Sequence, residues 1–313
     1  MIKKECFTTE WIEQVASELH YNDKNLIEKV IRALSLLEML VKAGCPLVFK
    51  GGTALMLILG KSAHRLSIDI DVICPPGTNI EDYLKSFADF GFINLELVER
   101  KQRDDADIPK SHSKFFYQIA YRNDTDAQSY ILLDVLYEDI HYFQTRQIAI
   151  DCPFIRLEGE PLMVTVPSAE DILGDKLTAF APNTTGIPYY KNGRSCSMEI
   201  AKQLYDVGRL FENVSGLQIT SEAFRKIALV ELSYRSLGTD IGQVFNDIRQ
   251  TALCISTRGK AGEGDFELIQ DGIIRVKSFM YKQRYQIDNA IIDASRAAYL
   301  ATLIEKGISE MEL

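Results

Sequence analysis

The sequence predicts an α+β fold, in which a mixed β-sheet with flanking helices is followed by an α-helical bundle. Three observations lead to this prediction. Short apolar runs with period-two alternation, bounded by glycine or proline, occupy the first part of the chain. Beyond residue 167 the apolar residues recur at three- and four-residue steps almost to the end. The polar stretch 182–196 separates the two regions, so we expect a first domain over 1–185 and a C-terminal helical domain over 186–313.

The composition is that of an ordinary globular protein and argues against several functional classes. Of the 313 residues, 46% are hydrophobic and 25% are charged, and the net charge of -9 argues against a surface built for non-specific DNA binding. The cysteines form no C-x-x-C pair, so we expect reduced thiols. No run reaches the ~18 apolar residues of a membrane span, and the N-terminus lacks the apolar segment of a signal peptide. We therefore expect a cytoplasmic protein with no membrane partner.

The first elements are a helix and a strand that lead into a glycine turn. Residues 23–44 indicate an amphipathic helix, and 46–50 indicate a short strand that a buried helix follows. Between strand and helix, the backbone N–H groups of Gly51 and Gly52 can approach a phosphate, and the helix N-terminus and the Thr53 hydroxyl add favourable interactions. These residues are therefore candidates for nucleotide binding, although an isolated G-G-T is usually only a turn.

Residues 66–74 predict a second strand that carries two carboxylates. Period-two alternation puts Ser67, Asp69 and Asp71 on one face and apolar residues on the other. Two carboxylates this close repel each other unless a cation lies between them, and Mg²⁺, or Mn²⁺ in its place, takes oxygen ligands. An isolated D-x-D is most often a pair of solvated acids on an edge strand. Arg65 and Ser67 are candidates for phosphate contact, and solvation is the alternative for Arg65.

Asp134 strengthens the prediction of a metal site. After the strand at 66–74 we expect a helix at 80–90, a strand at 92–100 and a surface loop at 100–113. Two strands at 115–121 and 130–137 follow, joined by a turn at 123–126, and the second of them contains Asp134. The last strand is apolar apart from Asp134, and a buried unpaired carboxylate is costly, so it needs a cation or a donor. If the two strands are neighbours, Asp134 joins Asp69 and Asp71 as a metal ligand, or acts as a base. The alternative is an acid at an exposed position.

The helical part carries two more candidates. Ser168 can begin a helix in which Lys176 shares the apolar face. An inward ammonium fits neutralisation of a triphosphate, and the alternative is a lysine that snorkels at the margin of the core. Asp206 lies at the edge of the apolar stripe of a helix over 197–211. An i,i+4 ion pair with Lys202 is the simplest interpretation of Asp206 from spacing alone.

Together these residues resemble a known family, the AbiEii/AbiGii-type nucleotidyltransferase toxins, which are classed with the MenT-like enzymes. The matching segments are 49–55 (FKGGTAL), 65–71 (RLSIDID), 132–136 (LLDVL), 170–179 (EDILGDKLTA) and 203–210 (QLYDVGRL). The resemblance implies a DNA-polymerase-β-like nucleotidyltransferase fold that uses Mg²⁺ and a nucleoside triphosphate. It implies metal ligation by Asp69 and Asp71, triphosphate contact by Lys176, and a late catalytic-site aspartate at Asp206.

The resemblance also implies a biological setting. Members of the family act as toxins of type IV toxin–antitoxin or phage-abortive systems. Some add nucleotides to tRNA 3′ ends, and a DNA-binding antitoxin is encoded beside them. The chain departs from the family pattern at Ile68, where an acid is common, and at Ala201-Lys202, where an R-D pair is common. Nothing after about residue 213 matches a known pattern.

The first hypothesis is therefore a Mg²⁺-dependent enzyme that transfers a nucleotide from an NTP to a macromolecular hydroxyl, such as the 3′ end of a tRNA. Two alternatives remain open. One is a catalytically silent nucleotide-binding interaction protein on the same fold, and the other is a metal-dependent nuclease, which needs clustered acids but no glycine turn. Because the chain is acidic, an RNA acceptor would bind through local basic patches, for which Lys191, Arg194 and Arg209 are candidates.

Overall fold

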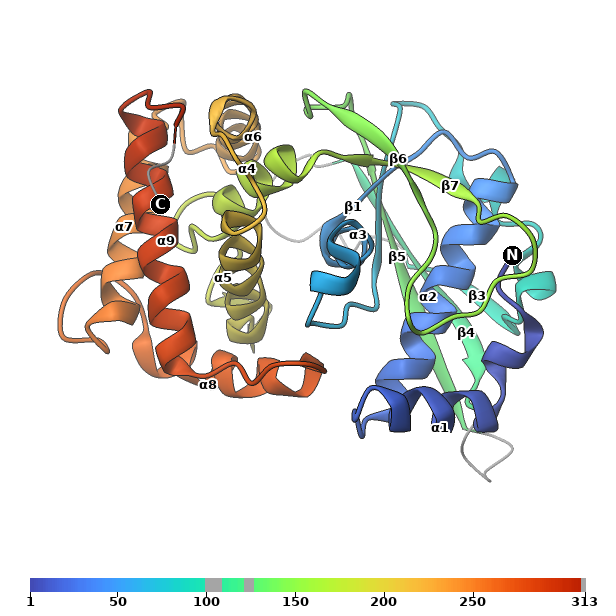
Figure 1. Ribbon diagram of the computed structural model, residues 1–313. Helices are drawn as coiled ribbons and strands as arrows, with labels where there is room; N and C mark the ends of the chain where they lie inside the picture. The colour runs from blue at the N-terminus through green and yellow to red at the C-terminus, as the bar shows by residue number, and fades with distance from the viewer. Residues whose placement is uncertain (99–108, 121–126, 311–313) are drawn as a thin grey trace.

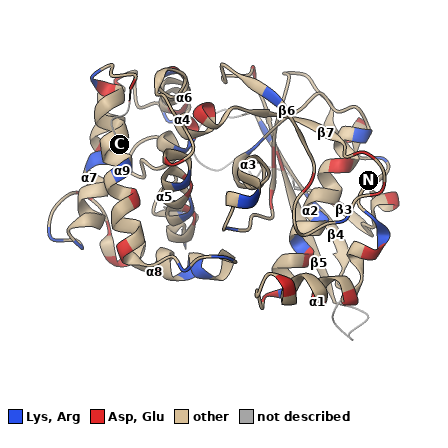
Figure 2. Ribbon diagram, in the orientation of Figure 1, with Lys and Arg blue, Asp and Glu red and all other residues tan. Residues whose placement is uncertain are grey.

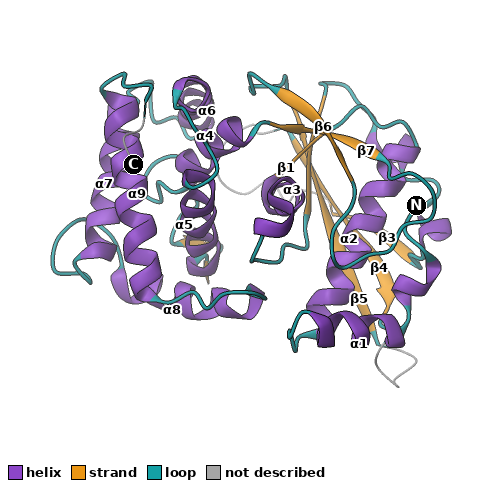
Figure 3. Cartoon of the chain, viewed as in Figure 1, coloured by secondary structure: helices purple, strands orange, loops and turns teal. Residues whose placement is uncertain are grey.

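The computed structural model describes residues 1–98, 109–120 and 127–310, which form an α+β fold with a helical C-terminal part (Figure 1). The strands lie in the first part of the chain, apart from one short hairpin, and helices make up the rest (Figure 3). The predicted fold class is confirmed. The predicted turn at 123–126 and most of the predicted loop at 100–113 lie outside the described residues.

A mixed five-stranded sheet with the order β1-β2-β5-β4-β3 is the centre of the first part. Its strands are β1 (Val48–Lys50), β2 (Ile70–Cys74), β3 (Asn94–Val98), β4 (Lys110–Gln118) and β5 (Gln128–Tyr137). The strands β2 and β5 run parallel, and the other neighbours run antiparallel. Two small antiparallel ladders join β6 (Thr145–Ala149) to β7 (Met163–Pro167) and β8 (Tyr190–Lys191) to β9 (Arg194–Ser195).

The register of the central strands places four polar residues in one row. Lys50 on β1 is the partner of Asp71 on β2, and Asp71 is the partner of Asp134 on β5. Asp134 is in turn the partner of His112 on β4. Register partners project from the same face of a sheet, so the four side chains lie next to one another across four strands. The two strands that carry the predicted acids are therefore neighbours.

Helices cover both faces of this sheet. They are α1 (Thr9–Glu18), α2 (Lys24–Lys42) and α3 (Gly51–Leu59). The Asp23 side chain caps α2 as predicted, because it accepts a hydrogen bond of 3.1 Å from the backbone N–H of Leu26. In Figure 1, α1 and α2 lie on one side of the sheet, and α3 lies on the side that faces the helical part. Leu55 of α3 packs in the hydrophobic core of the helical part, so α3 links the two parts of the molecule.

The helical part has a core of its own. Its helices are α4 (Ala169–Ala179), α5 (Ser197–Phe211), α6 (Gln218–Tyr234), α7 (Gly242–Ser256), α8 (Phe266–Val276) and α9 (Ile287–Glu305). Ser168 caps α4 as predicted. The apolar side chains of α4 pack with the other helices of this part, although the expected boundary at 185/186 assigns α4 to the first domain. The division of the chain into two domains at 185/186 stays a prediction. No helix in the described ranges is long and apolar enough to cross a membrane.

A connector between α8 and α9 attaches the helical part to the first part. The backbone N–H of Leu66 donates to the carbonyl of Phe279 at 2.8 Å, and the N–H of Tyr281 donates to the carbonyl of His64 at 3.0 Å. This pairing explains why the predicted strand at 66–74 begins only at Ile70. The segment before Ile70 takes its hydrogen-bond partners from the connector and not from the main sheet.

Two other predicted elements differ from the structure. The helix expected at 80–90 is two single turns of 3-10 helix, Ile80–Tyr83 and Phe87–Phe90, whose backbone bonds run from residue i+3 to residue i. The end of the loop expected at 100–113 belongs to β4, which begins at Lys110. Its polar sequence KSHS has no apolar alternation, and pairing with β5 extends the strand to include it.

Candidate active site

The predicted residues gather around one cleft of about 270 Å³ between the sheet and the helices α4 and α5. Figure 2 shows charged residues on α5 and on the central strands, the two sides between which this cleft lies. The predicted residues that line it are Gly51, Gly52, Arg65, Ser67, Asp69, Asp71 and Lys176. The other three, Thr53, Asp134 and Asp206, contact or adjoin its wall without lining it.

The glycine turn lies directly against the predicted acids. Gly51 has a φ of +79°, and a Cβ atom at this position would lie 2.1 Å from Oδ2 of Asp71. A Cβ atom on Gly52 would lie 2.6 Å from Oγ of Ser67 and 2.9 Å from Nη2 of Arg65. Only glycine allows the backbone to come this close to its neighbours at both positions. The backbone N–H groups at the start of α3 therefore lie beside the D-x-D, as expected for a phosphate-binding turn.

Thr53 has a structural role at the glycine turn. The Thr53 side chain is fully buried, and its hydroxyl donates a hydrogen bond of 2.7 Å to the backbone carbonyl of Asp69. In this structure the hydroxyl proton is thus donated to the protein backbone, and nucleotide binding by Thr53 stays a prediction. The hydrogen bond fixes the start of the D-x-D against the glycine turn.

The three acids influence one another electrostatically. Burial raises the pKa of Asp71 to about 7, and the negative charges of Asp134 and Asp69 contribute. The pKa of Asp69 is also raised by desolvation, against the opposing charge of Lys202, although part of the Asp69 side chain reaches solvent. The raised pKa values indicate that the positive charge near Asp69 and Asp71 is too small to offset their burial and mutual repulsion.

The donor chemistry of this set fits a divalent cation. Carboxylate oxygens are the ligands that Mg²⁺ and Mn²⁺ take, and a cation would offset the burial and the repulsion that together raise the pKa of Asp71. The side chains as they stand do not form a closed cluster, since no group of three or more His, Cys, Asp or Glu residues in the described part of the chain is close enough to hold a metal ion. Metal binding by Asp69, Asp71 and Asp134 would therefore involve movement of their side chains.

His112 is a site residue that the sequence did not reveal. Its Nδ1 lies 2.5 Å from Oδ1 of Asp134, on the neighbouring strand. The Asp134 side chain is 32% exposed, which lies between the buried and the exposed position considered from the sequence, and the imidazole is its hydrogen-bond partner. The signal was hidden because His112 falls in the segment predicted to be a loop.

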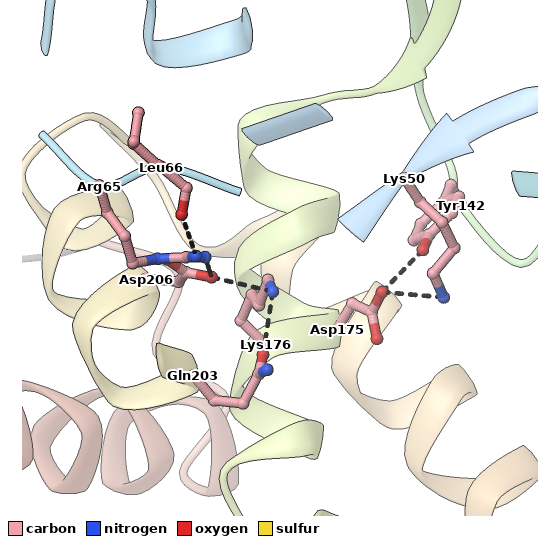
Figure 4. Close-up of polar contacts among 8 residues, drawn as sticks. All are labelled: Lys50, Arg65, Leu66, Tyr142, Asp175, Lys176, Gln203 and Asp206. Atoms are coloured by element: carbon pink, nitrogen blue, oxygen red, sulfur yellow. Dashed lines mark hydrogen bonds and ion pairs between the residues drawn. The ribbon is translucent and has the colours of Figure 1, made fainter. Parts of the chain in front are cut away.

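Asp206 is buried between two cations (Figure 4). Both of its oxygens contact the Arg65 guanidinium at 2.8 to 3.0 Å, and Oδ2 lies 2.9 Å from Nζ of Lys176. Burial alone would raise the pKa of Asp206, but the charges of Arg65 and Lys176 hold it below its ordinary value. The ion pair with Lys202 suggested by the spacing is absent from the described residues, because Arg65 and Lys176 occupy the carboxylate.

Lys176 and Arg65 also have defined places. The Lys176 ammonium is buried and donates to Oε1 of Gln203 at 2.9 Å, so it points inward as predicted. Arg65 is buried and not solvated, and its Nη1 also donates to the carbonyl of Leu66 at 2.9 Å. Asp206 thus positions two cations at the wall of the cleft.

A second charged pair was not predicted (Figure 4). Nζ of Lys50 lies 3.2 Å from Oδ2 of Asp175, and the Tyr142 hydroxyl donates to the same oxygen at 2.7 Å. Burial alone would raise the pKa of Asp175, but the Lys50 charge and the Tyr142 hydrogen bond hold it below its ordinary value. The position of Lys50 directly before the glycine turn was the available signal.

Lys202 is a further site residue that was not predicted from the sequence. Four cations line the cleft, and three of them, Lys50, Arg65 and Lys176, form ion pairs. Lys202 forms none with any described residue, and its ammonium lies 3.8 Å from the centre of the Phe279 ring. Burial and the charge of Arg65 lower the pKa of Lys202 to about 8. Lys202 is therefore a cation that forms no ion pair with a described residue, although Glu199, Asp69 and Asp206 are close enough to raise its pKa.

The structure brings two of the three predicted basic residues together. Lys191 and Arg194 are register partners in the β8–β9 hairpin. Arg209 lies near the C-terminal end of α5, where Glu212 binds it at 2.8 Å. Arg209 is therefore not part of the same patch.

Comparison with known proteins identifies the family of the chain. A family model described as "Nucleotidyl transferase AbiEii toxin, Type IV TA system" matches residues 33–290. The chain belongs to this family. As an AbiEii toxin it is a nucleotidyltransferase, its substrate is a nucleotide, and a cognate antitoxin is its partner. The resemblance seen in the sequence is thereby confirmed.

Two solved structures are similar to this AbiEii toxin. One is JHP933 from Helicobacter pylori, which is 16% identical over 90% of this chain and 94% of that chain, with a TM-score of 0.46. The other is MenT4, a nucleotidyltransferase toxin from Mycobacterium tuberculosis, which is 12% identical over 94% of this chain and 89% of that chain, with a TM-score of 0.48. No curated protein matches the sequence.

Proposed function

We propose that this AbiEii toxin transfers a nucleotidyl group from an NTP to the terminal hydroxyl of an RNA, such as the 3′ end of a tRNA. The observation that carries this proposal is the contact between the glycine turn and the acids. Gly51 lies against Asp71, and Asp71 is the register partner of Asp134. A triphosphate held at the turn would have its α-phosphate next to the carboxylates.

The reaction is a displacement at the α-phosphorus. The acceptor hydroxyl oxygen forms a bond to the α-phosphorus, the bond between that phosphorus and the oxygen bridging to the β-phosphate breaks, and pyrophosphate leaves. Asp134, which His112 holds, takes the hydroxyl proton. Catalysis then depends mainly on positioning and on neutralisation of charge.

The charged residues divide the remaining work. Asp69 and Asp71 would hold Mg²⁺ or Mn²⁺, which neutralises phosphate charge when bound, and Asp134 would be the third ligand in the alternative in which it is not the base. Gly51 and Gly52 offer backbone N–H groups, and Ser67 and Arg65 lie directly against them. Lys202 supplies a cation that forms no ion pair with a described residue, and Lys176 adds to the positive wall.

Asp69→Asn and Asp71→Asn test the proposal. Each variant is incubated with total tRNA, Mg²⁺ and each of the four labelled NTPs in turn. Label should enter RNA with the wild type and fall at least about a hundredfold in either variant, while circular dichroism stays unchanged. Unchanged incorporation in either variant would refute the assignment.

The same reactions separate the alternatives. Lengthened RNA means transfer, whereas shortened RNA without any NTP requirement means a nuclease. Calorimetry with Mg²⁺ and each NTP tests for a silent module, in which nucleotide binds but no product forms.

A further inference from the structure

A second cavity adjoins the catalytic cleft, and the proposed transfer leaves it unassigned. Its volume is about 260 Å³, and residues of β4, α4, α6 and the segment 185–191 line it. Asp175 and Ala179 line both this cavity and the catalytic cleft. The ion pair of Lys50 with Asp175 therefore stands where the two cavities meet.

The charge of this cavity favours an anionic ligand. Arg235 forms an ion pair with Glu231, and Asp175 forms one with Lys50. Two lysines of the wall, Lys110 and Lys191, have no ion-pair partner among residues 1–98, 109–120 and 127–310. In a chain of net charge -9, two cations without partners on one wall are a local site of positive potential.

The sheet register links this wall to the proposed catalytic acid. His112 is opposite Asp134, and Lys110 precedes His112 by two residues on β4. Residues two apart on a strand project from the same face and are roughly 6.8 Å apart along it. Lys110 therefore lies on the same face of the sheet as Asp134 and only a short step from it.

The β8–β9 hairpin extends the positive wall outward. Asn192 and Gly193 both have left-handed backbone conformations, with φ of 51° and 73°, as in the tight turn that fits the twist of a hairpin. This turn makes Lys191 and Arg194 register partners, so both basic side chains project from one face of the hairpin. The cations of Lys110, Lys191 and Arg194 thus form a row between Asp134 and the protein surface.

We propose that this second cavity is the entrance for the acceptor and binds the phosphodiester backbone of a single-stranded polynucleotide end. Lys110 and Lys191 contact its last phosphates, and the terminal hydroxyl passes the Lys50–Asp175 pair to reach Asp134. A cavity of about 260 Å³ has room for the end of one strand and is too small for a duplex. This inference rests on the proposed function, because it names the path by which the acceptor reaches the same site.

The test uses a charge-reversed double variant, Lys110→Glu/Lys191→Glu, in the full chain. The matched control is Lys4→Glu/Lys306→Glu, which changes the net charge equally at two exposed positions outside both cavities. The probes are a fluorescent single-stranded RNA of about twelve nucleotides for binding, by anisotropy at several salt concentrations, and Mg²⁺-NTP for calorimetry.

The double variant should bind the RNA at least about tenfold more weakly than the control. A plot of log affinity against log salt concentration should be less steep by about 1.4 for the variant, because two phosphate contacts to a single strand are lost. Its NTP affinity and its unfolding midpoint should match those of the control. Equal RNA binding by the double variant and the control would overturn the inference, as would failure of the wild type to bind the RNA at low salt.

Failure of the proposed function has a different signature. If the wild type binds RNA through these lysines but incorporates no nucleotide, the transfer reaction is wrong and the binding site stands. If the wild type incorporates nucleotide and the double variant does so with an unchanged KM for the RNA, the site is wrong and the reaction stands.

Discussion

The carboxylate of Asp206 is bound at both oxygens by the guanidinium of Arg65, at 2.8 to 3.0 Å, in a buried setting. The two residues are 141 positions apart in the chain and come from the two parts of the molecule. Removal of one partner of a buried pair leaves a charge without compensation, which makes the pair a stability determinant as well as a feature of the site.

Asp206→Ala should therefore lower the free energy of unfolding by about 3–5 kcal/mol, since Arg65 and Lys176 would both lose their counter-charge. Urea unfolding measures this. The control is Asp82→Ala, which breaks an exposed pair with Lys85 and should cost less than about 1 kcal/mol. Because the pKa of Asp206 is lowered in the folded state, its contribution is present at neutral pH and is lost as the pH falls through that pKa. A loss no larger than that of the control would contradict a buried pair.

Ionised Asp71 should destabilise the fold, whereas ionised Asp206 stabilises it. Its pKa of about 7 lies above the value of 3.8 for a free aspartate, so the folded state binds a proton that the unfolded state releases. Stability from this group therefore falls as the pH rises from about 4 to about 7. In metal-free buffer near pH 8, Asp71→Asn should raise the thermal midpoint, while near pH 4 the two proteins should differ little.

Differential scanning calorimetry with chelator checks this pH dependence. Added Mg²⁺ should then raise the midpoint of the wild type more than that of Asp71→Asn, because a ligand stabilises only a protein that binds it. A lower midpoint for the variant in metal-free buffer near pH 8 would show that the ionised carboxylate does not destabilise the fold.

Lys202→Met should weaken the binding of a nucleoside triphosphate by about tenfold, and Lys202→Arg should preserve most of it, because the contribution is a charge on phosphate. Binding of the matching monophosphate should change less. Since the pKa of Lys202 is about 8 in the free protein, triphosphate affinity of the wild type should fall as the pH rises through 8, and that of Lys202→Arg should not. Calorimetry at two pH values measures both effects. Parallel pH curves for the two proteins would exclude Lys202 as the contact.

Gly51→Ala should reduce transfer strongly, by at least about a hundredfold, because its methyl group takes the place of Oδ2 of Asp71. Gly44→Ala is a matched control, since Gly44 has a similar φ of +73° and nothing within 4 Å of a Cβ atom. The control bears only the left-handed backbone strain of about 1–2 kcal/mol and should keep its activity. Similar activity in the two variants would mean that the close approach at Gly51 is unimportant.

Local patterns predicted the central part of the site. Asp69 and Asp71 were predicted because alternation along one strand is visible in a short window. Gly51 and Gly52 were predicted because the glycine turn follows a strand and precedes the D-x-D closely in the sequence. Asp134 stood out because it breaks an apolar run.

What the sequence could not show depends on tertiary contacts. The spacing of Lys202 and Asp206 on one helix predicts a local ion pair, but Arg65 from the first part binds Asp206 instead. The Lys202 ammonium therefore has no ion pair with Asp206 and lies above the ring of Phe279, a residue of the connector. His112 became part of a strand only through pairing with β5, which no local pattern reveals.

The connector between α8 and α9 limits how the helical part of this protein could be exchanged for that of another protein. Its backbone is bonded to residues 64–66, directly ahead of the D-x-D, and its Phe279 ring lies under Lys202. A chimera that received a foreign helical half would lose these bonds unless the new half brought a compatible loop. Exchange of the helical part is therefore constrained by a few connector residues, which are far in sequence from the carboxylates that their bonds adjoin.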